Sequence, residues 1–384
     1  MKSQCYFIGT SLGDNPVPDH FMALAKELVR RGHRVVILAP HRRLELENHR
    51  GNPAIYMWPS ERPTKLRDAL FLFRLIREWR PACLIANFAA VNIMTVAGWL
   101  AGVPARVVWY HTISGQLAQD SLAPPWKTKL LNARKRLVYH AATHIVANSA
   151  ATAADVQGVY AVPKSKCRMF FNSLADPMIE SQRTASPMNG KLICVGRLFP
   201  SKGQDVLIRA LAILKSKLDA VRVEFVGEGP SLGAYQKLAR ELGVESECVF
   251  AGRVEHGEVL KKMAASVATV VPSRSEAFGL VNIESMAMGT PVVASAVGGI
   301  VEIVRDGMDG FLVPPDDPPA LALKLLTLLS NSELRQKMSR QARERFLAVF
   351  EQLRSVREQA DWHEALVSGT RQISATSVTY GTPV

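Results

Sequence analysis

The chain has 384 residues, too many for one ordinary domain and suitable for two. Apolar residues make up 48% of it, enough to build hydrophobic cores, so a largely disordered protein is excluded. The formal net charge is +13, and residues 1–180 carry most of it, with 23 Lys and Arg against 12 Asp and Glu. The first half therefore faces an anionic partner or has a basic solvated surface.

Cysteine usage favours a reducing compartment. The five cysteines are an odd number, are far apart in sequence and never show a C-x-x-C spacing, so neither a disulfide framework nor a metal site is expected. The first residues, MKSQCYFIGTSLG, have one Lys and a very short apolar run, which predicts a strand rather than a signal peptide. We therefore expect a cytoplasmic protein.

The first half alternates short apolar runs with longer amphipathic ones. Helical spacing covers residues 21–33 and 65–80, and strand-like runs occupy residues 5–12, 34–40, 83–88, 105–111 and 143–149. Such alternation predicts an α/β domain with a parallel sheet covered on both faces.

Residues 84–103, LIANFAAVNIMTVAGWLAGV, contain no charge and are long enough to span a bilayer. Asn87 and Asn92 interrupt the run, and Gly98 and Gly102 punctuate it. These interruptions favour a strand, a buried helix and a turn, with a membrane span as the alternative.

The α/β pattern restarts after the polar stretch 181–190, which we interpret as a linker. Strands are expected at 191–198, 221–229, 248–254, 269–273 and 291–295, and helices at 205–218, 231–243, 258–267 and 280–288. The predicted domains are 1–180 and 190–350, followed by a helix at 351–368 that packs back toward the N-terminal domain and a tail at 369–384. Ligands of open α/β sheets bind at the carboxyl ends of the strands.

The stretch PSRSEAFGLVNIESMAMGTPVVAS, residues 272–295, places two acids around a turn that leads into a helix. Glu276 precedes the helix start and Glu284 lies inside the helix. Three backbone amides at the start can face an anion, those of Phe278, Gly279 and Leu280. A ligand with phosphate and hydroxyl groups would suit this combination. The alternative is that Glu276 caps the helix and Glu284 is a solvated surface residue.

The stretch VGRLFPSKGQDVLIRAL places Arg197 and Lys202 in the loop after the first strand of the second domain. Two cations at a strand-to-helix turn can neutralise a diphosphate, although alone they would more often be surface charges. Because both motifs follow strands, we expect them to converge.

Taken together, GRL-x-x-x-KG, E-x-F-G-L-x-x-x-E and GTPVVAS-x-x-GG resemble the nucleotide-sugar half of the retaining glycosyltransferases of family 4. The resemblance continues in GGIVEIVRDGMDGFLVPPDDP and, more loosely, in LAKELVRRGHRV, THIVANSAAT and YAVPKSKCRMFFN, so it spans about residues 5–365. It implies the GT-B fold, two Rossmann-like domains that face each other across a cleft.

The resemblance also implies residue roles. Arg197 and Lys202 would bind the donor diphosphate and stabilise its charge as the glycosidic bond breaks. Glu276 would contact the sugar hydroxyls, and Glu284 the ribose. The amides at 278–280 would hold sugar and phosphate, and the turn at Arg253 and Val254 would lie against the base.

Two positions of the first domain complete the expected site. His111 ends a strand, and the resemblance gives it a positioning role at the donor sugar; the alternative is a hydrogen-bonded structural histidine. The family has a Gly-Gly loop where this chain reads GTSLGDNPVPDHF, so Gly13 is the candidate for phosphate contact and the role of the loop at 9–20 stays open. No two aspartates have the Asp-x-Asp spacing of metal-dependent sugar transferases, so neither a metal nor a cofactor is expected.

Residues 126–137 form a basic amphipathic pattern, with five cations and no acid between Trp126 and Arg136. Such a helix can lie on an anionic membrane, and residues 65–80 are a second candidate; the alternative is a solvated helix face. This pattern raises the hypothesis of peripheral binding to the inner face of the plasma membrane. No aromatic residues interleave with the cations as in nucleic-acid modules, so no nucleic-acid partner is expected.

The sequence thus predicts a retaining hexosyltransferase that moves a sugar from a UDP- or GDP-sugar to a glycan or lipid-linked acceptor, in cell-surface polysaccharide or lipopolysaccharide synthesis. The alternatives are a GT-B nucleotide-sugar epimerase or hydrolase, and a non-catalytic protein that binds nucleotide sugars or anionic surfaces. The donor sugar, base, acceptor and oligomeric state stay open.

Overall fold

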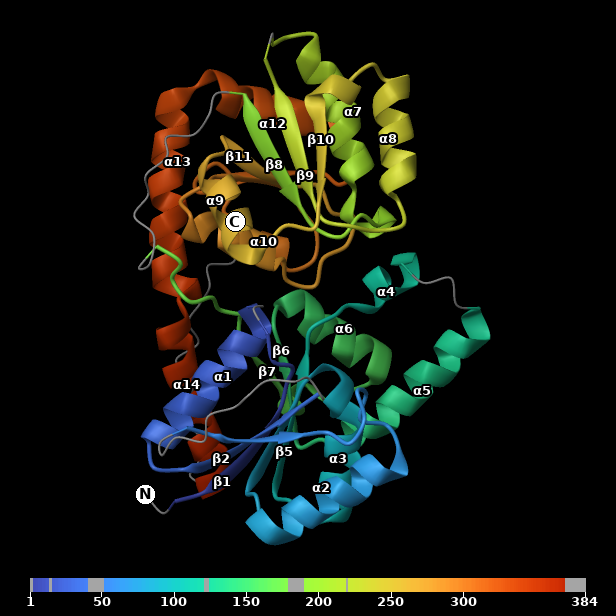
Figure 1. Ribbon diagram of the computed structural model, residues 1–384, viewed down its shortest axis with the longest axis vertical. Coiled ribbons are helices and arrows are strands. Elements are labelled where there is room, and N and C mark those ends of the chain that lie inside the picture. Colours follow the sequence, from blue (N-terminus) through green and yellow to red (C-terminus); the bar gives the residue numbers. More distant parts are fainter. Residues whose placement is uncertain are drawn as a thin grey trace. The chain divides into compact units, whose positions relative to one another are not determined.

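A computed structural model describes residues 3–13, 16–40, 52–120, 124–178, 190–218 and 220–369. Most of the predicted linker and tail, and Asn15 of the loop at 9–20, lie outside these residues. The chain divides into two compact units (Figure 1). Unit 1 comprises Met1–His111, Ala123–Ala175 and Gln352–Val384, and unit 2 comprises Thr112–Leu122 and Asp176–Glu351.

Unit 1 is built on a parallel sheet of seven strands in the order β3-β2-β1-β4-β5-β6-β7. The strands are β1 (Cys5–Gly9), β2 (Arg34–Ala39), β3 (Ala54–Met57), β4 (Cys83–Ala86), β5 (Ala105–Tyr110), β6 (His144–Ala147) and β7 (Cys167–Met169). The helices are α1 (Pro16–Arg30), α2 (Leu66–Trp79), α3 (Val91–Leu100), α5 (Pro125–Ala141), α6 (Ala150–Tyr160) and α14 (Gln352–Ser368). The strand order reverses between β1 and β4.

Alternate residues of β1 enter opposite cores, as the twofold repeat of a strand requires. Phe7 packs with residues of α2, α3, α5 and α6, whereas Tyr6 and Ile8 pack with α1 and α14. Both faces of the sheet are therefore covered, which explains why the strands are apolar throughout instead of alternating.

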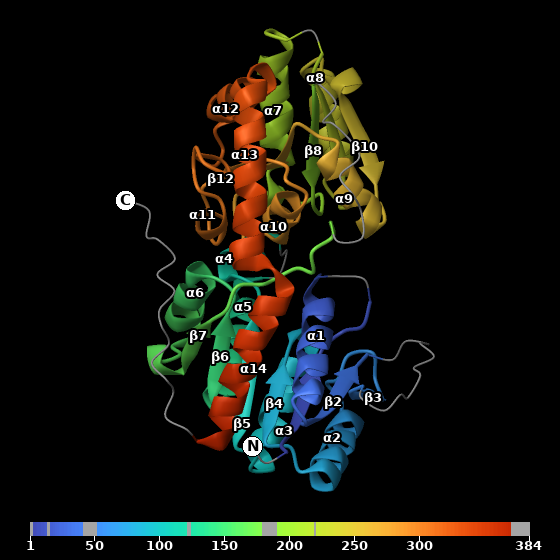
Figure 2. The ribbon, with the colours of Figure 1, turned by 90° about the vertical axis from the view of Figure 1, so that its left-hand side faces the viewer.

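Helix α14 packs along α1 of unit 1 (Figure 2). Its residues Val356, Ala360 and Trp362 belong to the same core cluster as Phe21 and Leu24 of α1. The last helix among the described residues therefore completes the N-terminal unit.

The uncharged segment at 84–103 forms β4, a short turn and α3. Gly98 of α3 lies against β4 so closely that an added Cβ would come within 2.4 Å of the Leu84 side chain. The membrane-spanning alternative is therefore wrong for this segment. Among the described residues, no helix is both long enough and apolar enough to cross a bilayer.

Unit 2 contains a parallel sheet of six strands in the order β10-β9-β8-β11-β12-β13. The strands are β8 (Lys191–Val195), β9 (Arg222–Val226), β10 (Cys248–Gly252), β11 (Ala268–Val271), β12 (Val292–Ser295) and β13 (Gly310–Val313). The helices are α4 (Ser114–Asp120), α7 (Gln204–Lys215), α8 (Leu232–Glu241), α9 (His256–Ala264), α10 (Leu280–Ala287), α11 (Ile300–Ile303), α12 (Pro318–Ser330) and α13 (Ser332–Arg345).

The sheet of unit 2 is also covered on both faces. Leu192 of β8 packs with α7, α8 and α12, and the next residue, Ile193, packs with α9. The strand order reverses between β8 and β11, which is where ligands bind in doubly wound sheets. Both units therefore have the predicted Rossmann-like α/β architecture.

Candidate active site

The loop after β8 carries the two predicted cations. Lys202 ends a short helical turn, Pro200–Lys202, and Gly203 follows with a φ of 66°. An added Cβ on Gly203 would lie 1.9 Å from the carbonyl oxygen of Pro272, which follows β11. Only glycine lets the two loops approach so closely, so this glycine brings both motifs to the reversal point of the sheet.

Lys202 and Glu276 meet at this point. The Lys202 Nζ donates to Glu276 Oε2 over 2.5 Å, and both side chains are mostly buried. The pair joins the carboxyl ends of β8 and β11, so the cation and the carboxylate from the two motifs form one site.

Two glycines of the GG motif shape the backbone around Glu276. Gly299 N donates to the carbonyl of Glu276, and Gly298 lies so close that an added Cβ would sit 1.8 Å from that oxygen. Gly298 also has a φ of 51°. The motif after β12 therefore supports the turn that presents the carboxylate.

Helix α10 starts beside this carboxylate. Gly279 has a φ of 99°, and an added Cβ would lie 3.3 Å from Glu276 Cγ. The Phe278 side chain is buried against Phe350, and the helix begins at Leu280. The first amides of a helix have no acceptor inside it, so the start of α10 directs N–H groups and the positive end of its dipole toward the site.

Glu284 is buried inside α10, so it is not the solvated surface residue of the alternative interpretation. Its Oε1 lies 3.1 Å from His256 Nε2, and His256 closely follows the exposed Arg253 and the half-buried Val254. The structure therefore brings the predicted ribose contact next to the predicted base turn.

Arg197 is exposed, with 62% of its side chain accessible. Its guanidinium lies over the Phe199 ring, 4.8 Å from the ring centroid, and 3.7 Å from the Asp120 carboxylate. Asp120 ends α4, a segment from the first half of the sequence that belongs to unit 2. The loose ion pair leaves this cation accessible to a ligand.

Arg274 clamps the two motif loops together. Its guanidinium binds both carboxylate oxygens of Asp205, at 2.8 and 2.7 Å, and the carbonyl of Pro200 at 2.7 Å. A further bond reaches Asp316 at 2.6 Å. These partners, Asp205 first, raise the pKa of Arg274 above its ordinary value, so the clamp is charged at any physiological pH.

In unit 1, His111 follows β5 and its ring stacks on Phe88, with 4.8 Å between centroids. Phe88 has a φ of 47°, uncommon for a bulky residue and a frequent mark of functional positions. Asn87 Nδ2 donates to the Gly9 carbonyl over 3.2 Å, and Asn87 Oδ1 lies 2.9 Å from His111 Nε2. These contacts lie where the order of the unit 1 strands reverses.

The Asn87 amide fixes the tautomer of His111. Because a carbonyl only accepts hydrogen bonds, the amide nitrogen of Asn87 must face Gly9 and its oxygen must face the histidine. His111 therefore donates through Nε2 and leaves a lone pair on Nδ1, which has no partner among the described residues. Burial, and then the proximity of His20, lowers the pKa of His111 to about 3, so the ring is neutral.

Gly13 lies after β1 and is exposed, with a φ of 139°. Its contact with phosphate stays a prediction, as do the ligand contacts of the other predicted residues. Four partners escaped the sequence analysis: Asn87, Asp120, His256 and Arg274. Each is an ordinary polar residue whose role follows from a tertiary contact, although Arg274 and His256 stand within a few residues of the recognised motifs.

Comparison with known families supplies the identification. The family model described as "Glycosyltransferase Family 4" matches residues 17–174, and the model "Glycosyl transferases group 1" matches residues 179–345. Between them they cover both units. The chain belongs to the group 1 glycosyltransferases of family 4. This confirms the resemblance, and the protein is a transferase of the GT-B fold.

The chain is also similar to named relatives and to solved structures. An uncharacterised glycosyltransferase of Methanocaldococcus jannaschii is 27% identical over 83% of this chain and 86% of its own length. A D-inositol 3-phosphate glycosyltransferase of Acidothermus cellulolyticus is 32% identical, over 58% of this chain and 56% of its own. Anabaena HepE, solved with UDP, superposes with a TM-score of 0.73 at 21% identity, over 94% of this chain and 100% of that one. At this identity the superposition shows the fold alone.

Proposed function

We propose that this glycosyltransferase is a retaining, metal-independent hexosyltransferase that uses a UDP- or GDP-sugar as donor. The observation that carries the proposal is the Lys202–Glu276 pair at the strand-order reversal of unit 2, beside the start of α10. Anabaena HepE, which shares this fold, was solved in complex with UDP, and this supports the donor class.

The proposed chemistry follows from charge. The bond between the anomeric carbon and the diphosphate oxygen breaks, and its electron pair leaves with the nucleoside diphosphate. Lys202, Arg197 and the amides of α10 stabilise the growing negative charge, an effect that can contribute several kcal/mol in a preorganised site. The acceptor hydroxyl bonds to the anomeric carbon on the face that the diphosphate leaves, and its proton passes to the departing phosphate.

The remaining predicted residues orient the donor. Glu276 accepts hydrogen bonds from sugar hydroxyls, Glu284 binds the ribose, and the turn at Arg253 and Val254 lies against the base. His111 has a positioning role at the donor sugar. The acceptor is a glycan or a lipid-linked glycan of a cell-surface polysaccharide or lipopolysaccharide, reached from the cytoplasmic face of the membrane.

Nucleotide binding and turnover test this proposal. We expect UDP or GDP, or its sugar conjugate, to raise the unfolding temperature in the presence of EDTA. Lys202→Ala should lower turnover by about 10²–10³-fold, as loss of one group that stabilises a developing anion does elsewhere. Lys237→Ala, at a largely exposed lysine of α8, is the control and should keep full turnover. Unchanged turnover in Lys202→Ala, or no nucleotide binding at all, would overturn the donor site.

A further inference from the structure

Exposed apolar side chains are concentrated on three neighbouring helices of unit 1. Nine of the nineteen large apolar residues exposed in the described chain lie on α2, α3 and α5, so exposure is concentrated there instead of scattered. They are Leu66, Leu70, Val96, Trp99, Leu100, Trp126, Leu130, Leu131 and Leu137. Soluble proteins rarely leave such a cluster uncovered unless it binds something.

The helices enclose a groove. Figure 1 shows α3 between α2 and α5, and residues from all three line a hollow of about 380 Å³. Its lining is mainly apolar and includes Leu66, Phe73, Val96 and Leu100, with Arg134 of α5 at the wall. The groove provides an apolar recess for which the described residues offer no occupant.

A second hollow, of about 1230 Å³, continues from the first because Phe73 and Leu100 line both. Its lining adds Arg74 and Arg77 of α2 and Arg80, which directly follows that helix, together with the carboxylate of Glu78. Guanidinium groups bind phosphate oxygens in pairs, so this end of the groove is suited to phosphate groups.

Charge around the surface is strongly one-sided. On Lys65 and the helices α2, α3 and α5, the exposed charged side chains are one carboxylate, Glu78, and eight cations. The cations are Lys65, Arg67, Arg74, Arg77, Lys127, Lys129, Arg134 and Arg136. Within the described residues none of the eight forms an ion pair, so their charge is available to an anionic partner.

We propose that the surface of α2, α3 and α5 binds a bilayer that contains anionic phospholipids. The exposed Trp and Leu side chains enter the interfacial region, and the arginines at the end of α2 bind lipid phosphates. Apolar insertion combined with a basic rim is the arrangement by which amphipathic helices bind such membranes. The sequence drew attention to α5 and α2, whereas α3, which carries Trp99 and Leu100, joins them into one surface only in the fold.

The proposal rests on the proposed function for its purpose, since it names the surface that would hold the enzyme at a lipid-linked acceptor. Helix α3 links the two within unit 1. Its first turn follows Asn87 and Phe88 beside His111, and its last turn carries Trp99 and Leu100. Ten residues of helix span about 15 Å, so the predicted site residue His111 lies near the surface that we assign to lipid.

Vesicle co-sedimentation of the full chain, without any nucleotide, tests the binding. We expect binding to phosphatidylcholine vesicles that contain phosphatidylglycerol, weaker binding to phosphatidylcholine alone, and weakening by salt. Absence of binding to the anionic vesicles at low salt overturns the proposal. Insertion is tested with brominated acyl chains, which should quench tryptophan emission in the wild type and much less in Trp99→Phe/Trp126→Phe.

Two pairs of variants locate the surface. Trp99→Ser/Leu100→Ser removes apolar side chains and Arg74→Glu/Arg77→Glu reverses charge, and each should weaken binding about tenfold or more. The controls are Leu323→Ser and Arg209→Glu, at exposed positions of α12 and α7 in unit 2, and both should bind like the wild type. Equal binding by all four variants overturns the proposal.

Two further measurements distinguish a lipid-binding surface from an interface between copies of the chain, and from the donor site. Light scattering in solution should show the same mass for wild type and Trp99→Ser/Leu100→Ser; a dimer in the wild type that the variant loses, without vesicle binding, would make the surface an interface between copies and overturn the proposal. Calorimetric titration with UDP and GDP should give the same affinity in the wild type and the surface variants. Vesicle binding that fails while nucleotide binding persists removes only the lipid surface, and the reverse removes only the donor site.

Discussion

The side chain of Asn87 controls the hydrogen-bonding character of His111. In Asn87→Asp the introduced carboxylate still accepts from His111 Nε2, but it stabilises the imidazolium and raises the pKa of His111 from about 3 in the wild type. Once protonated, the ring is a cation and is no longer the neutral imidazole that the wild type places in the site. We therefore predict an acid limb in the kcat/KM profile of the variant at higher pH than in the wild type, with activity recovered at alkaline pH.

A direct measurement of the His111 tautomer is the control for this prediction. Nitrogen chemical shifts of the His111 ring should show a neutral, Nε2-protonated imidazole in the wild type at neutral pH and a titrating ring in Asn87→Asp. Superimposable pH profiles of the two enzymes would show that the reaction does not depend on a neutral His111 ring.

The sequence predicted site residues correctly where charged side chains directly follow strands. Lys202 and Glu276 were predicted to converge because each follows a strand, and the structure joins them at 2.5 Å. Asn87 and Arg274 were missed because their importance depends on which loops the fold brings together. Their partners, Gly9 and Asp205, lie far away in the sequence, so the residues next to Asn87 and Arg274 do not predict these contacts.

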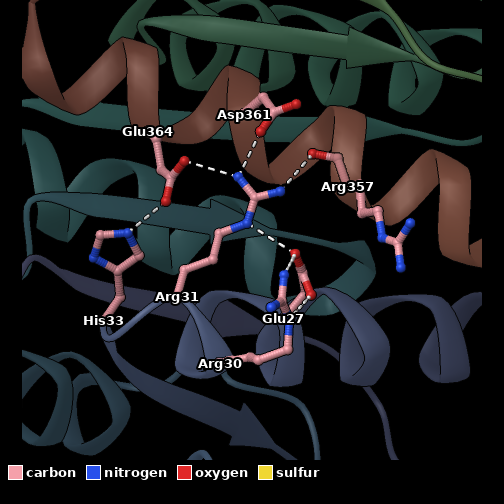
Figure 3. A network of polar contacts seen from close by, with 7 residues as sticks. All are labelled: Glu27, Arg30, Arg31, His33, Arg357, Asp361 and Glu364. Atoms are coloured by element: carbon pink, nitrogen blue, oxygen red, sulfur yellow. Dashed lines mark hydrogen bonds and ion pairs between the residues drawn. The ribbon is translucent and has the colours of Figure 1, made fainter. Parts of the chain in front are cut away.

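One arginine, Arg31, is the centre of a charged network between α1 and α14 (Figure 3). The Arg31 guanidinium binds Glu27, Asp361 and Glu364, at 2.8, 2.5 and 2.8 Å. The carboxylate of Glu364 is buried and also meets the ring of His33 at 2.7 Å. Arg31 thus joins three acids from two helices at the edge of the unit 1 core.

We predict that Arg31→Ala destabilises the protein by about 3 kcal/mol, because it leaves the buried Glu364 with only His33 as a partner. Arg30→Ala is a matched control, since Arg30 also binds Glu27 but its side chain is 69% exposed and contacts α1 alone. Such exposed pairs contribute about 1 kcal/mol or less. Urea denaturation of both variants checks this, and equal losses would contradict the special role of Arg31.

His363 of α14 gives the N-terminal unit a dependence on acid. It is fully buried, and neither ring nitrogen has a hydrogen-bond partner among the described residues. Burial, followed by the proximity of His144 and His20, lowers its pKa from 6.5 to about 3. As the pH falls below 6.5, His363 binds a proton in the unfolded state but stays neutral in the folded state. The free energy of unfolding therefore decreases until the pH reaches the pKa of the folded state.

His363→Leu removes this contribution. We predict a variant about 1 kcal/mol more stable than the wild type at neutral pH, because no unpartnered polar ring is buried. The advantage should grow by about 2 kcal/mol at pH 5, from the 1.36 kcal/mol carried by each pKa unit. Urea denaturation at both pH values measures it. Some acid sensitivity should remain, since burial also lowers the pKa of His20 to about 4; a pH-independent advantage would contradict the argument.

Element-scale prediction was most reliable for the buried strands and worst at the sheet edges. Every strand in the interior of both sheets was expected from its apolar run, whereas the edge strands β3, β7 and β13 were not. All residues of β3 and β7 are partly exposed, and these strands have four and three residues, so they lack the buried run that marks a strand. Strand β13 is mostly buried but has only four residues, the first of them a glycine. Residues 84–103 stayed ambiguous because composition alone does not show where an apolar run folds back on itself.

The chain passes between the two units four times. Each unit nevertheless has hydrophobic cores of its own. The sequence predicted two domains with a helix at 351–368 returning to the first, and helix α14 belongs to unit 1. The segment Thr112–Leu122 belongs to unit 2, which the alternation of helices and strands gave no reason to expect. That segment delivers Asp120 to Arg197, a contact encoded far from either motif.

All six tryptophans of the chain fall in unit 1, so tryptophan fluorescence reports the unfolding of that unit alone. Under the proposed function, the nucleotide binds residues of unit 2. At a hundred times its dissociation constant, a nucleotide adds about 2.7 kcal/mol to the stability of the unit that holds it. We therefore predict that UDP or GDP raises the thermal transition seen by circular dichroism while the tryptophan-detected transition stays in place. Lowering the pH should instead lower the temperature of the tryptophan-detected transition, because the buried histidines His20, His111 and His363 all lie in unit 1. If nucleotide shifts both signals together, the two units unfold as one, and the separate cores do not amount to separate stabilities.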